Sequence, residues 1–173
     1  VRKMPKTGSL TFAKQSSAAM QDVKCDLDDY GALLIRLGNG ARGVFMTSSL
    51  CAGRKVRIDL QVYGSKESLC WNHEKSFELF VGHRDQPNEI MIESPLMQKE
   101  ASRKYALLPS GHPMGYHDAI CNLFGEFYCA VERNISGKKG ISNYPTFADA
   151  TCELKLVEAA LKSARTGKWV DIR

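Results

Sequence analysis

Residues 110–120, "SGHPMGYHDAI", carry the densest group of side chains that could do chemistry in this chain. Histidine exchanges protons near neutral pH, and tyrosine and aspartate form hydrogen bonds with polar ligands. His112 lies between Gly111 and Pro113, so its backbone is expected to be irregular just ahead of an apolar helix. Such a position is typical of the mouth of a cleft. The sequence leaves open whether His112 has a functional role or only a capping or packing role.

The helix that follows could bring Tyr116 to the same cleft. His117 and Asp118 are interpreted as polar residues of the first helical turn, where Asp118 also suits the positive end of the helix dipole. The two other histidines, His73 and His83, fall in polar strand ends or loops and are predicted to be solvated surface residues.

Two cations, Arg54 and Lys55, follow Gly53 in the loop that leads into an alternating segment, "CAGRKVRID". They could hold an anionic or polyhydroxylated ligand, although a solvated loop is the favoured interpretation. The chain contains no G-x-G-x-x-G before a helix, no Walker A motif, no G-x-S-x-G and no H-E-x-x-H. We therefore predict no catalytic residue, no cofactor-binding residue and no metal ligand within it.

The elements that must position these residues begin as strands. Asn39-Gly40 between two apolar runs predicts a tight hairpin, because both residues tolerate a positive φ. The segment "VRIDLQVYG" alternates strictly, which predicts a strand of an antiparallel sheet with one apolar face. Further short strands are predicted within "GSKESLCWN", "FELFVG" and "NEIMIES", and a last one at "KWVDI". The result is a meander of about six or seven strands.

Two helices follow the strands. Apolar residues recur at helical spacing from Tyr116 to Val131. A second helix is predicted to begin at Thr146, with Asp149 completing a capping box, and to end at Gly167. Strands first and helices last predict an α+β fold, with an open, mainly antiparallel sheet and helices packed on one of its faces. The other face would need a partner if it carries apolar residues.

The composition is that of an ordinary soluble globular protein, with 43% hydrophobic and 25% charged residues. The length of 173 residues predicts a single domain over residues 1–173. No apolar run reaches the roughly 20 residues of a membrane span. The six cysteines form no C-x-x-C pair, and several are expected to be buried free thiols, which favours a cytoplasmic location. The net charge of +5 is spread along the chain, so no nucleic-acid partner is predicted.

Four segments occur in an order that resembles the C-terminal domain of the Gfo/Idh/MocA oxidoreductases, the glucose–fructose oxidoreductase and inositol dehydrogenase family. The resemblance covers nearly all of the chain from about Leu10. The segments are "DDYGALLIRLGNGARGVFMTSS", "AGRKVRIDLQVYGSKESLCWN", "HPMGYHDAICNLFGEFYCAV" and "PTFADATCELKLVEAALKSARTGKWVDI".

The resemblance implies a two-domain parent protein in which an N-terminal Rossmann domain binds NAD or NADP. Its C-terminal domain closes the site for a sugar, polyol or related substrate, and one sheet face packs against another subunit as a homodimer or higher homo-oligomer. The resemblance also implies that His112 and Tyr116 contact substrate and that Arg54 or Lys55 lines the same cleft.

The chain departs from the full family pattern. It lacks the glycine-rich cofactor fingerprint and the E-K-P segment with its lysine. The sequence closest to the family's D-x-x-x-H motif, "DVKCDLDDY", contains no histidine. The chain also begins without Met. We expect a fragment, truncated at its N-terminal side, that binds no cofactor and is inactive alone. The alternatives are a binding or scaffolding module that reuses the fold and, with least support, an independent enzyme that uses His112 and Tyr116.

Overall fold

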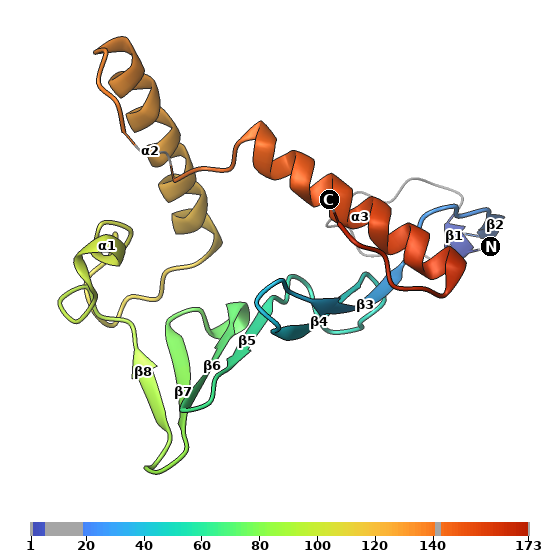
Figure 1. Ribbon diagram of the computed structural model, residues 1–173, viewed down its shortest axis with the longest axis horizontal. Helices are drawn as coiled ribbons and strands as arrows, with labels where there is room; N and C mark the ends of the chain where they lie inside the picture. Colours follow the sequence, from blue (N-terminus) through green and yellow to red (C-terminus); the bar gives the residue numbers. More distant parts are fainter. Residues whose placement is uncertain (1, 6–18, 141–142, 173) are drawn as a thin grey trace. The chain divides into compact units, whose positions relative to one another are not determined.

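The computed structural model describes residues 2–5, 19–140 and 143–172 (Figure 1). The chain divides into two compact units, Val1–Gly53 and Arg54–Arg173. No helix within the described residues is both long and apolar enough to cross a membrane.

The first unit contains two antiparallel strand pairs. β1 (Arg2–Pro5) pairs with β2 (Met20–Val23), and β3 (Tyr30–Arg36) pairs with β4 (Arg42–Ser48). The turn between β3 and β4 confirms the predicted hairpin. Gly40 has a φ of 86°, in the region that favours glycine, and its N–H donates to the Leu37 carbonyl at 2.9 Å.

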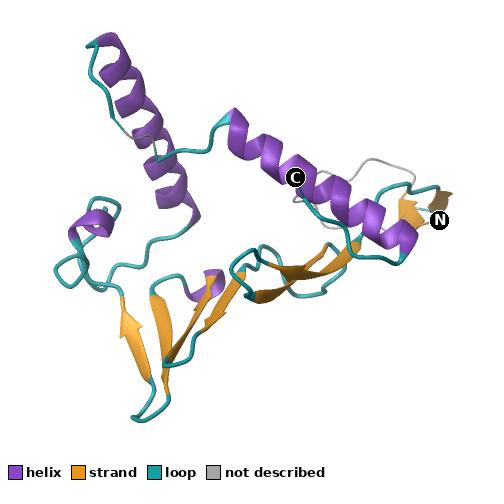
Figure 2. Ribbon diagram, viewed as in Figure 1, coloured by secondary structure: helices purple, strands orange, loops and turns teal. Residues whose placement is uncertain are grey.

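The second unit begins with a four-stranded antiparallel meander in the order β5-β6-β7-β8 (Figure 2). The strands are β5 (Asp59–Tyr63), β6 (Glu67–Asn72), β7 (Glu78–His83) and β8 (Glu89–Ile92). A short 3₁₀ helix, η1 (His73–Lys75), connects β6 to β7, and Asn72 caps it by accepting the Glu74 N–H.

The register of this sheet divides its side chains into two faces, because successive residues of a strand point to opposite sides. The residues paired or in line with Leu60 form the apolar face, whose apolar residues are Leu60, Val62, Leu69, Trp71, Leu79, Val81 and Met91. The same face ends in Glu67, His83 and Glu89. The opposite side, the mixed face, carries Asp59, Gln61, Tyr63, Ser68, Cys70, Asn72, Glu78, Phe80, Ile90 and Ile92. Within the described residues, Val81 on the central strand β7 is the one hydrophobic residue that is fully buried.

Three α-helices complete the second unit: α1 (Glu100–Arg103), α2 (Tyr116–Ile135) and α3 (Phe147–Thr166). The start of α3 matches the prediction, because Asp149 accepts the Thr146 N–H at 2.7 Å while Thr146 Oγ1 accepts the Asp149 N–H. The Thr146 hydroxyl also donates to Asp149 Oδ2 at 2.6 Å, and this bond, followed by the one from the Thr146 N–H, lowers the pKa of Asp149. The helix ends at Gly167, whose φ is 64°. Antiparallel strands followed by helices confirm the α+β fold class.

Some sequence predictions about the elements are wrong. Residues 168–172, "KWVDI", belong to none of the strands of the described chain. The strand predicted from Val56 begins at Asp59. β1, β2 and α1 were not predicted, and the described strands form three separate sheets. The cysteines are free, but Cys70 is only partly buried and the other five are exposed. Three of these five lie on α2 and α3, which have no buried residue.

Candidate functional site

The loop before α2 is fixed at its end by hydrogen bonds. The Ser76 hydroxyl, just after η1, donates to the Met114 carbonyl. Asp118 lies in the first turn of α2, as predicted, and its Oδ2 accepts the Gly115 N–H at 2.8 Å. The end of the four-stranded sheet that leads into η1 is therefore joined to the loop before α2 by the hydrogen bond between Ser76 and Met114.

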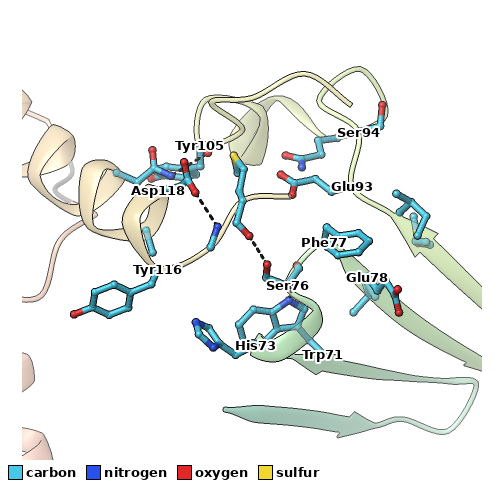
Figure 3. Close-up of a pocket in the computed structure, with 18 of the residues that line it drawn as sticks. Trp71, His73, Ser76, Phe77, Glu78, Glu93, Ser94, Tyr105, Tyr116 and Asp118 are labelled. Carbon is cyan, nitrogen blue, oxygen red and sulfur yellow. Dashed lines mark hydrogen bonds between the residues drawn. The ribbon is translucent and has the colours of Figure 1, made fainter. Parts of the chain in front are cut away.

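A cavity of about 580 Å³ opens between these elements, all within the second unit (Figure 3). Its floor comes from the ends of β6, β7 and β8, and its other walls come from η1, the α1 region and the first turns of α2. The lining residues are Ile58, Trp71, His73, Ser76, Phe77, Glu78, Leu79, Met91, Ile92, Glu93, Ser94, Met97, Gln98, Tyr105, Met114, Gly115, Tyr116, Asp118, Ala119 and Asn122. The volume is in the range of small-molecule sites.

The indole of Trp71 is held in one orientation at the floor of the cavity. Its Nε1–H donates to the Ser76 carbonyl at 2.9 Å, and its ring meets the His73 ring edge-on, with centroids 6.1 Å apart. His73 is fixed in turn, because its Nδ1 lies 3.1 Å from the Val56 carbonyl oxygen. The polar edge of Trp71 is thus occupied by protein, and its apolar surface remains for packing.

Tyr105 contributes a second wall and is held from outside the cavity. Its hydroxyl donates to Glu126 Oε1 at 2.9 Å and accepts from Asn143 Nδ2 at 3.2 Å, while its carbonyl accepts from Asn122 Nδ2 at 2.9 Å. Lys104 also donates to Glu126. The Lys104 and Tyr105 hydrogen bonds lower the pKa of Glu126, and the same bond to Glu126 raises the pKa of Lys104.

The charged lining residues are all carboxylates, and no lysine or arginine is among the residues that line the cavity. Asp118 is engaged with the Gly115 N–H, and Glu78 lies 3.3 Å from the Lys75 ammonium. Glu93 is partly buried, and its carboxylate makes no hydrogen bond or ion pair with any described residue. The cavity therefore offers apolar and aromatic walls with one carboxylate available to a ligand.

The four residues predicted to contact substrate lie in the second unit but in different surroundings. Tyr116 lines the cavity, and its side chain is exposed at the start of α2. His112 is an exposed loop residue outside the lining, and its N–H donates to the Pro109 carbonyl. Arg54 lies 2.6 Å from Glu74 in η1, and Lys55 is exposed; neither lines the cavity. Their contact with a substrate stays a prediction.

Sequence reasoning missed Trp71, Glu93 and Tyr105 as candidate site residues. Trp71 was assigned only to a short strand, and Glu93 only to the polar end of another. The available signal was the spacing of Leu69 and Trp71, two residues apart in one strand, which places the large Trp71 ring on the same face as Leu69.

The described residues do not fit a dinucleotide cofactor. All their strand pairs are antiparallel, so they contain no βαβ unit. The glycine-rich segment around Gly40 lies in the β3–β4 hairpin and not ahead of a helix N-terminus, where phosphate groups bind. The described residues also contain no group of three or more His, Cys, Asp or Glu side chains placed to hold a metal ion.

The family model for the C-terminal alpha/beta domain of the Gfo/Idh/MocA oxidoreductases matches residues 3–172. The chain belongs to the Gfo/Idh/MocA family. The uncharacterized oxidoreductase YfiI of Bacillus subtilis is 25% identical over 87% of this chain and 39% of its own length. This Gfo/Idh/MocA chain thus spans about two fifths of that relative.

Two solved structures place the family fold beside known ligands. An inositol dehydrogenase homolog from Azotobacter vinelandii, complexed with NADH and myo-inositol, is 27% identical with a TM-score of 0.76, over 84% of this chain and 40% of that one. Levoglucosan dehydrogenase, complexed with NADH and levoglucosan, is 25% identical with a TM-score of 0.68, over 85% of this chain and 39% of that one. Both Gfo/Idh/MocA relatives therefore combine a nicotinamide cofactor with an uncharged sugar or polyol.

Proposed function

We propose that this chain is the substrate-closing and oligomerisation domain of an NAD(P)-dependent oxidoreductase that acts on a sugar, polyol or related compound. The observation that carries the proposal is the cavity between the Trp71 end of the sheet and the start of α2, with Tyr116 at its rim. Family membership and the ligands of the two solved relatives support it.

The role of this chain is to bind and orient the substrate. The bound nicotinamide supplies hydride-transfer chemistry, and its binding site lies outside the described residues. Trp71 and Tyr105 pack against the ligand, while Tyr116 at the rim and His112 in the preceding loop contribute hydrogen bonds. Closure of these walls excludes water from the reacting carbon. The chain alone is inactive and binds no cofactor, and no residue of it takes the proton of the reaction.

The mixed face of the sheet is the surface we assign to homo-oligomerisation, as a homodimer or higher assembly. It is the sheet face opposite Trp71 and Leu79, and two of its apolar residues outside the cavity lining are exposed: Tyr63 by 73% and Ile90 by 62%. Exposed apolar residues rimmed by charges are typical of an interface. Light scattering of the protein at micromolar concentration is expected to give a dimer or larger species, and a monomer would contradict this assignment.

Titration calorimetry tests whether nucleotide binding requires residues outside this chain. NAD(H) and NADP(H) are titrated into this chain and into the protein extended upstream in its gene, and both are then assayed with a panel of sugars and polyols. We expect only the extended protein to bind nucleotide and to oxidise a member of the panel. We place the protein in the reducing cytoplasm, where free thiols persist. Tight nucleotide binding by this chain alone, or no turnover of any panel member by the extended protein, would overturn the proposal.

A further inference from the structure

The cavity has a charge pattern that can select among sugars and polyols. Its carboxylates have unequal surroundings, since those of Asp118 and Glu78 face an N–H group or a lysine. Two cations outside the lining have carboxylate partners of their own: Arg54 is paired with Glu74, and Lys104 with Glu126. Glu93 therefore remains as the charged group that a ligand in the cavity would meet.

The backbone holds Glu93 at the edge of the cavity. It directly follows β8, and its N–H donates to the Phe77 carbonyl at 2.8 Å, which continues the pairing of β7 and β8 by one residue. Figure 3 shows its carboxylate directed toward the space between the sheet and α2. A carboxylate in this position accepts hydrogen bonds but donates none.

The wall formed by Trp71 determines which other surface a ligand must have. The N–H of Trp71 is committed to the Ser76 carbonyl, so the indole presents apolar surface to the cavity. A ring that carries C–H groups on one face and hydroxyl groups at its edge satisfies both walls, because the C–H face buries against Trp71 while hydroxyls donate to Glu93.

We propose that this cavity selects an uncharged polyhydroxylated ring and rejects its phosphorylated or carboxylated analogues, with Glu93 as the residue that determines this specificity. The inference rests on the proposed function and narrows its substrate class. An anionic group in the cavity meets the like charge of Glu93, and no lysine or arginine lines the cavity to neutralise it, in an environment that screens charge less than water does. The same carboxylate strengthens the hydrogen bonds donated by neutral hydroxyls.

The test uses the protein that contains both this chain and its upstream region. Dissociation constants are measured by calorimetry, with reduced cofactor bound, for myo-inositol, D-glucose, D-glucose 6-phosphate and D-glucuronate. We expect both anionic probes to bind at least about tenfold more weakly than the better neutral probe. Glu93→Gln is expected to weaken neutral binding by about tenfold and to reduce the discrimination against both anions.

A second variant and a matched control separate charge from folding. Glu93→Lys is expected to reverse the preference, so that D-glucose 6-phosphate binds more tightly than D-glucose. Glu132→Gln removes the same charge from an exposed residue of α2 outside the cavity, and it is expected to change no dissociation constant. Circular dichroism confirms that each variant retains its helices.

The outcomes distinguish the two proposals. If neutral sugars are oxidised but the anionic probes bind equally well, or if Glu93→Lys and Glu93→Gln leave the preference unchanged, the role of Glu93 is wrong and the proposed function stands. If no probe binds and no sugar or polyol is oxidised, the proposed function fails and this inference fails with it.

Discussion

The apolar face of the four-stranded sheet ends differently at its two ends. At the hairpin end, His83 is 8% exposed and lies between Glu67 and Glu89, which it approaches to 3.5 Å and 3.2 Å. At the other end, Trp71 borders a cavity and the Glu93 carboxylate has no partner among the described residues. The same strands thus close one end with their own charges and leave the other end available.

The difference separates stability from binding. Ring nitrogens of His83 face a carboxylate on each neighbouring strand, although its Nε2 has no hydrogen-bond partner among the described groups. Such a cluster can hold three strands in register, and none of its three residues lines the cavity at the Trp71 end. We therefore expect substitutions at the His83 end to change stability alone, and those at the Trp71 end to change both stability and ligand affinity.

The largest effect is expected for Trp71→Ala. Removing a partly buried indole should lower the free energy of unfolding by about 2 kcal/mol and weaken binding of a neutral sugar at least about tenfold. Trp71→Phe keeps an aromatic wall but loses the bond to the Ser76 carbonyl, so about 1 kcal/mol is expected. Urea denaturation and calorimetry measure both quantities. Unchanged sugar affinity in Trp71→Ala would remove the binding role from this end.

Local signals in the sequence were sufficient where structure depends on a few neighbouring residues. The Asn39-Gly40 turn and the α3 caps at Thr146 and Gly167 were predicted because each is formed by residues close in the chain. The segment at residues 168–172 failed for the opposite reason. Its alternation resembles a strand, but a strand also needs a partner, and alternation cannot supply one.

The candidate site depends on contacts between distant segments and was therefore predicted only in part. Tyr116 was found because an irregular loop runs directly into its helix. Trp71, Glu93 and Tyr105 come together only through the register of three strands and the bonds that Tyr105 makes to α2 and Asn143. No pattern within any one of these segments marks it as part of a cavity.

His83→Ala should have the next largest effect, at the closed end. It leaves Glu67 and Glu89 without the ring between them, and we expect a loss of about 1–2 kcal/mol in the free energy of unfolding with no change in sugar affinity. His117→Ala, at an exposed position on α2, is the control and should be within about 0.5 kcal/mol of the parent. A loss of sugar affinity in His83→Ala would mean that the two ends are coupled.

Glu126→Gln tests the hydrogen bonds that Glu126 accepts from Lys104 and Tyr105, which hold the Tyr105 wall of the cavity in place. The pKa of Glu126 is lowered in the folded protein, so its contribution is present above its unfolded pKa and is lost as the pH falls through the folded value. The pKa of Lys104 is raised, so its contribution is lost only as the pH rises through that raised value.

The difference in urea midpoint between parent and Glu126→Gln should therefore be constant from about pH 5 to 9 and shrink below about pH 4. The sugar dissociation constant should rise a few-fold in the variant, because the Tyr105 ring is less well held. A midpoint difference that stays constant down to pH 2 would show that the charge of Glu126 does not strengthen its hydrogen bonds with Lys104 and Tyr105.

The smallest effect is expected for Glu89→Gln, which removes one of the two charges beside His83. The Glu89 side chain is 59% exposed, so water and salt screen its interaction, and we expect a change within about 0.5 kcal/mol. Double-mutant cycles with His83→Ala, measured by urea denaturation in low and high salt, isolate the pair. A coupling well above 1 kcal/mol, or one that salt leaves unchanged, would mean that burial of the ring governs the pair. The closed end would then owe its stability to one carboxylate and not to a balance of two.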